Sequence, residues 1–260
     1  MIDVLAASVD DVHALADRLA HVERGAAGAR ALVDAGDLAA ADAKVRPEDA
    51  RRTLAGRAAL RLLLAARAGR PLSSAAGVAI DRACSRCGAQ HGQPSVAGLS
   101  VSTSTSGDHV LIAVGEREAV VGVDVEVVPD ELWAGFDDYV LHPHERGGLP
   151  AGDAGISPRI RIWAEKEAVL KAAGLGLRDA PARLRISDVE VPGGWPTGAG
   201  VLDPGAWRPV AATEVREAAG TWVTAIEVAA DAWGVLAAAA PQPIRRWTIG
   251  DLVDARPSAA

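Results

Sequence analysis

The run AVVGVDVEVV at residues 119–128 limits the fold more than any other stretch of the chain. Alternate residues are valine, and Gly122, Asp124 and Glu126 lie between them. Successive side chains of a β-strand leave opposite faces, so this spacing predicts a strand with one apolar face and both carboxylates on the other, their Cα atoms about 6.5 Å apart. Carboxylates this close repel one another unless a cation joins them. The stretch therefore predicts either an exposed strand edge or a cation site, and Gly122 leaves space for a ligand beside Asp124.

The stretch RIWAEKEAVLKAAGLGL at residues 161–177 has helical spacing instead. Its apolar arc comprises Ile162, Trp163, Val169, Leu170 and Ala173. Lys166 projects from the middle of this arc. A lysine ammonium on a packing face must either extend to solvent or meet a buried anion, and a phosphate group would serve as that anion.

Glu167 and Lys171 are four residues apart on one side of the same predicted helix, next to the apolar arc. One interpretation is a surface ion pair, which contributes at most about 0.5 kcal/mol. The other is a site in which Glu167 joins Asp124 and Glu126. Three carboxylates supply the hard oxygen ligands that Mg²⁺ takes together with water and substrate phosphates.

The remaining sequence predicts helices and strands in a mixed order. The expected elements are a helix at 48–68, a hairpin at 99–116 that turns at 106–108, a short helix near 143–145, a loop at 147–158, a helix at 159–174 that stops at a left-handed Gly174, and strands at 183–191 and 221–229. A helix followed by strands occurs twice, which favours two similar lobes. We expect an α+β fold of two lobes related by a pseudo-twofold axis, each a helix packed on an antiparallel sheet, with the site between them. The predicted lobes are residues 1–118 and 119–260, with a loose tail from about residue 241.

Composition narrows the class of protein. The chain has 260 residues and a net charge of −7, and one Phe and one Tyr leave Ala, Val and Leu to form the core. An acidic N-terminus and the lack of an apolar run of roughly 18 residues predict a soluble, cytoplasmic protein. Residues 44–70 have eight basic residues against two acidic ones, a net +6. This segment is either a solvated helix face or the binding surface of a compact polyanion such as a nucleotide.

The segment CSRCGAQH supplies Cys84, Cys87 and His91 at a spacing typical of zinc ligands. A structural zinc site needs four ligands, and this segment offers three. Reduced thiols in a loop are the alternative, and two cysteines do not indicate a disulfide framework.

The first two stretches together resemble the paired signature of the 4′-phosphopantetheinyl transferases, G-[VI]-D-x-E followed by W-x-x-K-E-A-x-x-K-x-x-G-x-G-L. The resemblance extends over about residues 46–190, and the length and two-lobe organisation match the surfactin-type monomeric branch. Such enzymes move the phosphopantetheine arm of coenzyme A onto a serine of a carrier protein and release adenosine 3′,5′-bisphosphate. The resemblance implies that coenzyme A and apo acyl or peptidyl carrier domains are the partners of a monomer, without nucleic acid or membrane.

The resemblance also implies roles for single residues. Asp124, Glu126 and Glu167 would hold Mg²⁺, with Mn²⁺ as a substitute, against the coenzyme A pyrophosphate. Glu167, directly or through a metal-bound water, would take the proton from the incoming serine. Lys171 would neutralise or protonate the departing phosphate, and Lys166 would bind coenzyme A.

Further coenzyme A contacts are implied at the start of the chain. In ARRTLAGRAALR, Arg52 and Thr53 would lie near the adenosine 3′-phosphate. Ser104 and Thr105 occupy the place where many relatives have Ser-His, and Gln93 stands where they have lysine. Both departures remove a cation and are expected to weaken coenzyme A binding.

Two other functions remain open. A paralogue that binds coenzyme A or a carrier domain without efficient transfer would explain Thr105 and Gln93. A Mg²⁺ nuclease or phosphatase could use the same carboxylates, but it would leave the pattern at 163–177 unexplained.

Overall fold

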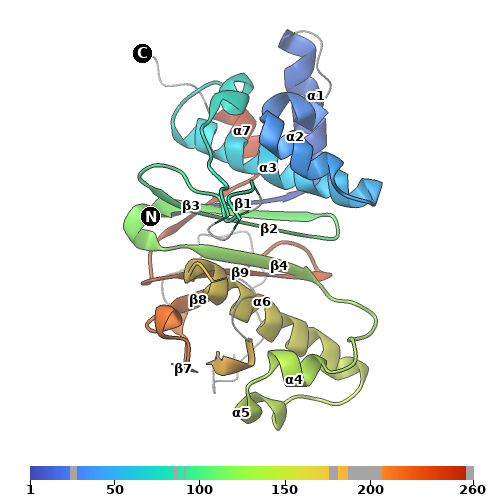
Figure 1. The fold of residues 1–260 in the computed structure, drawn as a ribbon, viewed down its shortest axis with the longest axis vertical. Helices are drawn as coiled ribbons and strands as arrows, with labels where there is room; N and C mark the ends of the chain where they lie inside the picture. Colours follow the sequence, from blue (N-terminus) through green and yellow to red (C-terminus); the bar gives the residue numbers. More distant parts are fainter. Residues whose placement is uncertain (24–27, 85–86, 91, 176–180, 187–206, 256–260) are drawn as a thin grey trace. The chain divides into compact units, whose positions relative to one another are not determined.

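The computed structural model describes residues 1–23, 28–84, 87–90, 92–175, 181–186 and 207–255 (Figure 1). Contacts divide the chain into two compact units: the N-terminal unit, Asp3–Val114 with Arg245–Ala260, and the C-terminal unit, Met1–Ile2 with Gly115–Ile244. The sequence predicted a boundary near residue 118 and placed the whole C-terminal end in the second lobe. The structure instead returns the last strand and helix to the first unit.

The N-terminal unit combines a four-stranded sheet with helices. Its elements are β1 (Ile2–Ser8), α1 (Val9–Glu23), the 3₁₀ helix η1 (Gly28–Leu32), α2 (Ala35–Asp42), α3 (Pro47–Arg67), η2 (Leu72–Gly77), β2 (Leu99–Ser106), β3 (His109–Glu116), β10 (Ile244–Trp247) and α7 (Ile249–Asp254). The sheet order is β10-β1-β3-β2, and β1 runs antiparallel to β3. The helix predicted at 48–68 and the hairpin with its turn at Gly107 are confirmed.

Asp3 explains why the C-terminal end is not loose. Its carboxylate is fully buried on β1, where it pairs with Arg67 of α3 and Arg245 of β10. The indole Nε1 of Trp247 donates a third hydrogen bond to it at 2.8 Å. The prediction of a loose tail is therefore wrong for residues 244–254, because a buried carboxylate holds β10 against β1.

The C-terminal unit contains the strand and the helix of the two signature stretches. Its elements are η3 (Arg117–Ala119), β4 (Gly122–Val127), α4 (Phe136–Val140), α5 (Pro143–Arg146), η4 (Asp153–Gly155), α6 (Ile156–Ala172), η6 (Pro181–Arg183), β5 (Leu184–Arg185), β6 (Arg208–Pro209), β7 (Ala212–Thr213), η8 (Arg216–Ala218), β8 (Trp222–Ile226) and β9 (Ala232–Ala238). The order β4-β9-β8-β6 forms an antiparallel sheet, and β5 pairs separately with β7.

The mixed α+β class is confirmed, and both units pack one long helix with a sheet. The pseudo-twofold relation stays a prediction. The strand predicted at 183–191 is seen at β5, and its part from residue 187 lies outside the described residues. The sequence missed β9, because its residues AWGVLAA show no alternation of apolar and polar side chains. In the described part of the chain, no helix combines the length and apolar character needed to cross a bilayer.

Gly122 sets the distance between α6 and β4. A Cβ atom at this position would overlap the backbone carbonyl oxygen of Ala168 and the backbone nitrogen of Ala172. Figure 1 shows α6 running beside β4 and β9, and its alanines and valines pack into one cluster with those of β8 and β9. The space that the sequence left for a ligand at Gly122 is therefore filled by the helix backbone, which corrects that prediction.

We expect Gly122→Ala to destabilise the protein by about 3 kcal/mol, because the clash is with backbone atoms that cannot rotate away. The midpoint of urea unfolding measures this change. Gly148→Ala is the matched control, since a Cβ atom there meets nothing within 4 Å, and its free energy of unfolding should change by less than about 0.5 kcal/mol. Equal midpoints for the two variants would contradict the close approach of helix and strand.

Candidate active site

The polar face of β4 meets α6 along its length. The ammonium of Lys171 lies 2.6 Å from Oδ1 of Asp124. At the far end of the strand, Nε1 of Trp163 donates a hydrogen bond to Oε1 of Glu126 at 3.1 Å. Because Gly122 contacts the last turn of α6, the strand and the helix are antiparallel. The structure thus brings the two signature stretches together residue by residue.

Glu167 lies between these contacts and is 5% exposed. Burial first, and then the negative charges of Asp124 and Glu126, raise the pKa of its carboxyl from 4.5 to about 7, and the charge of Lys171 opposes this rise. Its Oε1 atom is buried and has no hydrogen-bond partner among the described residues. The carboxyl of Glu167 can therefore hold or release a proton near neutral pH.

These side chains suit a hard divalent cation. The buried, unbonded oxygen of Glu167 and the carboxylates that raise its pKa form an oxygen-rich donor set of the kind Mg²⁺ takes. As they stand, however, no three His, Cys, Asp or Glu side chains in the described residues are gathered as a metal site. The ammonium of Lys171 lies against Asp124 instead. The ligand set Asp124, Glu126 and Glu167 therefore stays a prediction that the donor chemistry fits.

A hollow opens beside Glu126. It has a volume of about 410 Å³ and is lined by Glu126, Val127, Pro129, Glu131, Leu132, Trp133, Ile160 and Trp163. Trp163 also makes edge contacts with Trp133, at 5.8 Å between ring centroids. Its indole is therefore held by aromatic packing on one side and by the Glu126 carboxylate on the other. This arrangement fixes the direction of the Glu126 side chain.

Lys166 meets a buried anion, as the sequence predicted, but this anion is not a phosphate. Its side chain is 0% exposed, and its ammonium lies 2.6 Å from Oε2 of Glu145 and 2.6 Å from the carbonyl oxygen of Val140. The buried anion is thus a protein carboxylate. The assignment of Lys166 to coenzyme A is corrected, because an ammonium enclosed by α5 and the end of α4 has no surface to offer a phosphate.

Glu145 is a residue that sequence reasoning missed. Besides Lys166, its carboxylate accepts hydrogen bonds from the backbone nitrogens of His142 at 2.9 Å and Ile186 at 2.8 Å. It therefore ties α5, α6 and the strand after η6 to one point. The capping box that it forms with His142 was the available signal, but nothing in the sequence linked it to Lys166.

The predicted coenzyme A residues of the N-terminal unit lie around Gly56. A Cβ atom there would come within 2.9 Å of Cγ2 of Thr105, so α3 approaches β2 at this point. Arg52 is one helical turn before Gly56, and it pairs with Asp49, while the hydroxyl of Thr53 donates to the Asp49 carbonyl at 2.7 Å. The structure thus brings Arg52 and Thr105 to one face of α3, and their contact with coenzyme A stays a prediction.

The net charge of +6 at residues 44–70 is partly balanced in the folded protein by carboxylates of other elements. Six of its arginines pair with carboxylates, mostly from other elements: Arg46 with Glu48 and Asp49, Arg51 with Asp10, Arg52 with Asp49, Arg57 with Asp37, Arg61 with Asp34 and Asp37, and Arg67 with Asp3. Neither sequence alternative describes this segment fully, since much of it joins the protein's own ion pairs.

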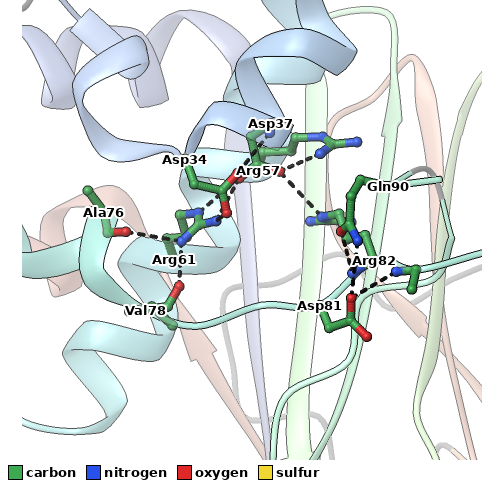
Figure 2. Close-up of polar contacts among 10 residues, drawn as sticks. Asp34, Asp37, Arg57, Arg61, Ala76, Val78, Asp81, Arg82 and Gln90 are labelled. Carbon is green, nitrogen blue, oxygen red and sulfur yellow. Dashed lines mark hydrogen bonds and ion pairs between the residues drawn. The ribbon is translucent and has the colours of Figure 1, made fainter. Parts of the chain in front are cut away.

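Figure 2 shows the most buried of these pairs. The guanidinium of Arg61 lies 2.8 Å from Asp37 and donates to the carbonyl oxygen of Val78 at 2.5 Å. Arg82 enters from the following loop at 3.5 Å from Asp37. Burial and the charge of Arg57 lower the pKa of Arg82 to about 10, so it remains charged at neutral pH. The cluster joins α2, α3 and the loop before β2.

Gln93 and Ser104 are the other predicted coenzyme A residues. Gln93 is exposed and follows Gly92, whose backbone nitrogen donates to the carbonyl oxygen of Arg82 at 2.7 Å. Ser104 is half-buried on β2. Cys84 and Cys87 form no disulfide. His91 lies outside the described residues, so the zinc alternative stays untested.

A protein-family model of the 4′-phosphopantetheinyl transferase superfamily matches residues 120–221. This range includes β4 and α6, and with them Asp124, Glu126, Glu167 and Lys171. Comparison with curated proteins gives no match.

Glu167 predicts a pH dependence of stability. Between its ordinary pKa of 4.5 and its folded pKa of about 7, the folded state binds more protons than the unfolded state. The stability that the protonated carboxyl contributes is present below the lower value and is lost as pH rises through the higher one. From pH 5 to pH 8 we expect the wild type to lose about 2 kcal/mol more than Glu167→Gln in urea unfolding. Equal losses in both proteins would show that this carboxyl does not titrate as described.

Trp163 predicts an effect on metal affinity. Trp163→Phe keeps an aromatic ring but removes the hydrogen bond to Glu126, and we expect Mn²⁺ to bind roughly 10-fold more weakly. Electron paramagnetic resonance of free Mn²⁺ gives the affinity. Trp207→Phe is the control, since its Nε1 donates to the backbone carbonyl oxygen of Gln242 at 3.2 Å rather than to a carboxylate. A similar loss in both variants would assign the effect to packing.

Proposed function

Residues 120–221 form a domain of the 4′-phosphopantetheinyl transferase superfamily, and from this premise we propose that the chain transfers the 4′-phosphopantetheine arm of coenzyme A to a serine of an apo carrier protein in a Mg²⁺-dependent reaction. One observation supports the proposal above the others. Glu167 and Lys171 of α6 face Asp124 and Glu126 of β4, with a proton-accepting carboxyl and an ammonium in the same small site.

The carboxylates would hold the cation. Asp124, Glu126 and Glu167 offer oxygen ligands, and a bound Mg²⁺ supplies charge neutralisation to the two phosphates of the pyrophosphate. Trp163 keeps Glu126 directed into the site through its Nε1 hydrogen bond. Buried Asp124 is fixed by its strand. Orientation and charge therefore do most of the catalytic work that phosphoryl transfer requires.

Proton transfer falls to Glu167 and the leaving group to Lys171. The serine oxygen bonds to the phosphorus that carries the pantetheine arm, and the pyrophosphate bond to the adenosine side breaks. The serine proton passes to Glu167, whose carboxyl is buried in the site beside Lys171. The ammonium of Lys171 neutralises the departing adenosine 3′,5′-bisphosphate. Charge balance is kept without a covalent enzyme intermediate.

The proposal extends to points that follow from the resemblance. Arg52 and Thr53 contact the adenosine 3′-phosphate, and Ser104, Thr105 and Gln93 contribute uncharged hydrogen bonds to coenzyme A. We assign the chain to the surfactin-type monomeric branch and place its reaction in the cytoplasm, with acyl or peptidyl carrier domains as partners.

A second candidate is a paralogue that binds coenzyme A or a carrier domain and transfers slowly. The neutral residues Thr105 and Gln93 favour it, since each contributes a weaker bond to a phosphate than a cation does. The four side chains on β4 and α6 favour the enzyme, because a binding module has no use for a base beside an ammonium.

Intact mass spectrometry of several apo carrier proteins, after incubation with the protein, coenzyme A and Mg²⁺, tests the proposal. We expect a mass gain of one phosphopantetheine group on at least one carrier and none when a chelator removes the metal. Asp124→Asn should lower turnover about 100-fold or more, because the amide keeps the shape but not the charge. A carrier set that stays unmodified while coenzyme A binds in calorimetry would support the binding paralogue instead.

A further inference from the structure

The Lys171–Asp124 pair has properties that set it apart from the pair made by the other lysine of α6, Lys166. The Asp124 side chain is 3% exposed, whereas that of Lys171 is 25% exposed. Lys171 is also the next-to-last residue of the helix, which ends at Ala172. The carboxylate is thus fixed on a buried strand, and the ammonium lies at the end of a long side chain that reaches solvent. The ammonium can leave while the carboxylate stays.

Lys166 shows the contrast. Its side chain is 0% exposed, and that of its partner Glu145 is 6% exposed. If either member moved away, the other would stay buried without a counter-charge. The two lysines of one helix therefore have different freedom. Lys166 is fixed in the fold, and Lys171 can exchange partners.

A divalent cation at the same carboxylates would meet this ammonium. Lys171 is 2.6 Å from an oxygen of Asp124, and its charge also acts on Glu167. A cation bound by those oxygens would lie within a few ångströms of Nζ, and like charges at that separation repel. The ammonium and the cation therefore compete for one carboxylate.

We infer that Lys171 is the resident counter-ion of the site. The cation displaces its ammonium from Asp124, and the phosphates of coenzyme A then receive that ammonium. The cation and coenzyme A therefore bind cooperatively. This inference rests on the proposed function for the identity of the phosphate ligand. Binding reciprocity then follows: coenzyme A tightens the metal by the same factor by which the metal tightens coenzyme A.

The inference is tested first without coenzyme A. Mn²⁺ binding is measured by electron paramagnetic resonance in the wild type, Lys171→Met and Lys171→Gln. We expect both variants to bind Mn²⁺ about 10-fold more tightly, because the competing charge is gone. Arg183→Met is the control for net charge alone, since Arg183 is an exposed cation of the same unit that pairs with Glu214. Its affinity should stay within about twofold of wild type.

Thermal unfolding keeps the test independent of activity. Without metal, Lys171→Met leaves the buried carboxylates without this counter-ion and should melt below the wild type. Added Mn²⁺ should then raise its melting temperature by more than it raises that of the wild type, because a tighter ligand stabilises more. Folding of the variants is checked in the same measurement.

Repeating the Mn²⁺ titration with coenzyme A present measures the cooperativity. Coenzyme A should tighten Mn²⁺ in the wild type by a factor about fivefold larger than in Lys171→Met, since the variant has no ammonium to transfer. Equal tightening in the two proteins would overturn the exchange.

The outcomes separate this inference from the proposed function. Equal Mn²⁺ affinity in the wild type and both Lys171 variants overturns the counter-ion role, even where carriers are modified. Tighter Mn²⁺ in the variants, with no carrier modified, supports the counter-ion role and contradicts the transferase. Loss of Mn²⁺ binding in every protein overturns both.

Discussion

The candidate site depends on a glycine that lets a helix backbone touch a strand. With hydrogen in place of a side chain at Gly122, the carbonyl of Ala168 lies where a Cβ atom would be. That approach fixes the register of α6 along β4, so Lys171 reaches Asp124 and Trp163 reaches Glu126 at opposite ends of the contact. Any larger residue at 122 would move α6 outward and separate all of these pairs at once. Gly122 therefore acts together with Asp124 and Glu126: the glycine lets the helix approach, and the two carboxylates then lie against it.

Burial then decides which charged pairs build the fold and which remain available for chemistry. Lys166 and Glu145 are both enclosed, at 0% and 6% exposed. Removing one member of such a pair leaves an uncompensated charge, typically at a loss of about 3–5 kcal/mol. Lys171 with Asp124 has the same short contact, but one member reaches solvent. Distance alone would rank these pairs as equals, and exposure distinguishes them.

The sequence predicted the elements that have a clear period and failed where partners are distant. Alternation gave β4, and helical spacing gave α6, with the carboxylates on one face as expected. The partner of Lys166 was beyond reach, because Glu145 is 21 residues away in a one-turn helix. The meaning of Gly122 was also beyond reach, since a missing side chain can admit either a ligand or a backbone. The net charge of residues 44–70 was a poor guide to the charge of α3 in the fold for the same reason. Asp3, Asp10 and Asp37, which are distant in the sequence, pair with arginines of this helix.

These corrections shift the charge balance of the proposed reaction. Coenzyme A carries several phosphate charges, and the N-terminal unit offers fewer cations to meet them than its sequence indicated. Arg57 and Arg61 pair with Asp37, and Gln93 and Thr105 are neutral where the resemblance implies a cation in many members of the family. Lys166 is enclosed with Glu145 and therefore does not neutralise a phosphate of coenzyme A. More of the neutralisation then falls on the cation and on Lys171, which makes the partner exchange of that lysine matter more in this chain than in a relative with the additional histidine and lysine.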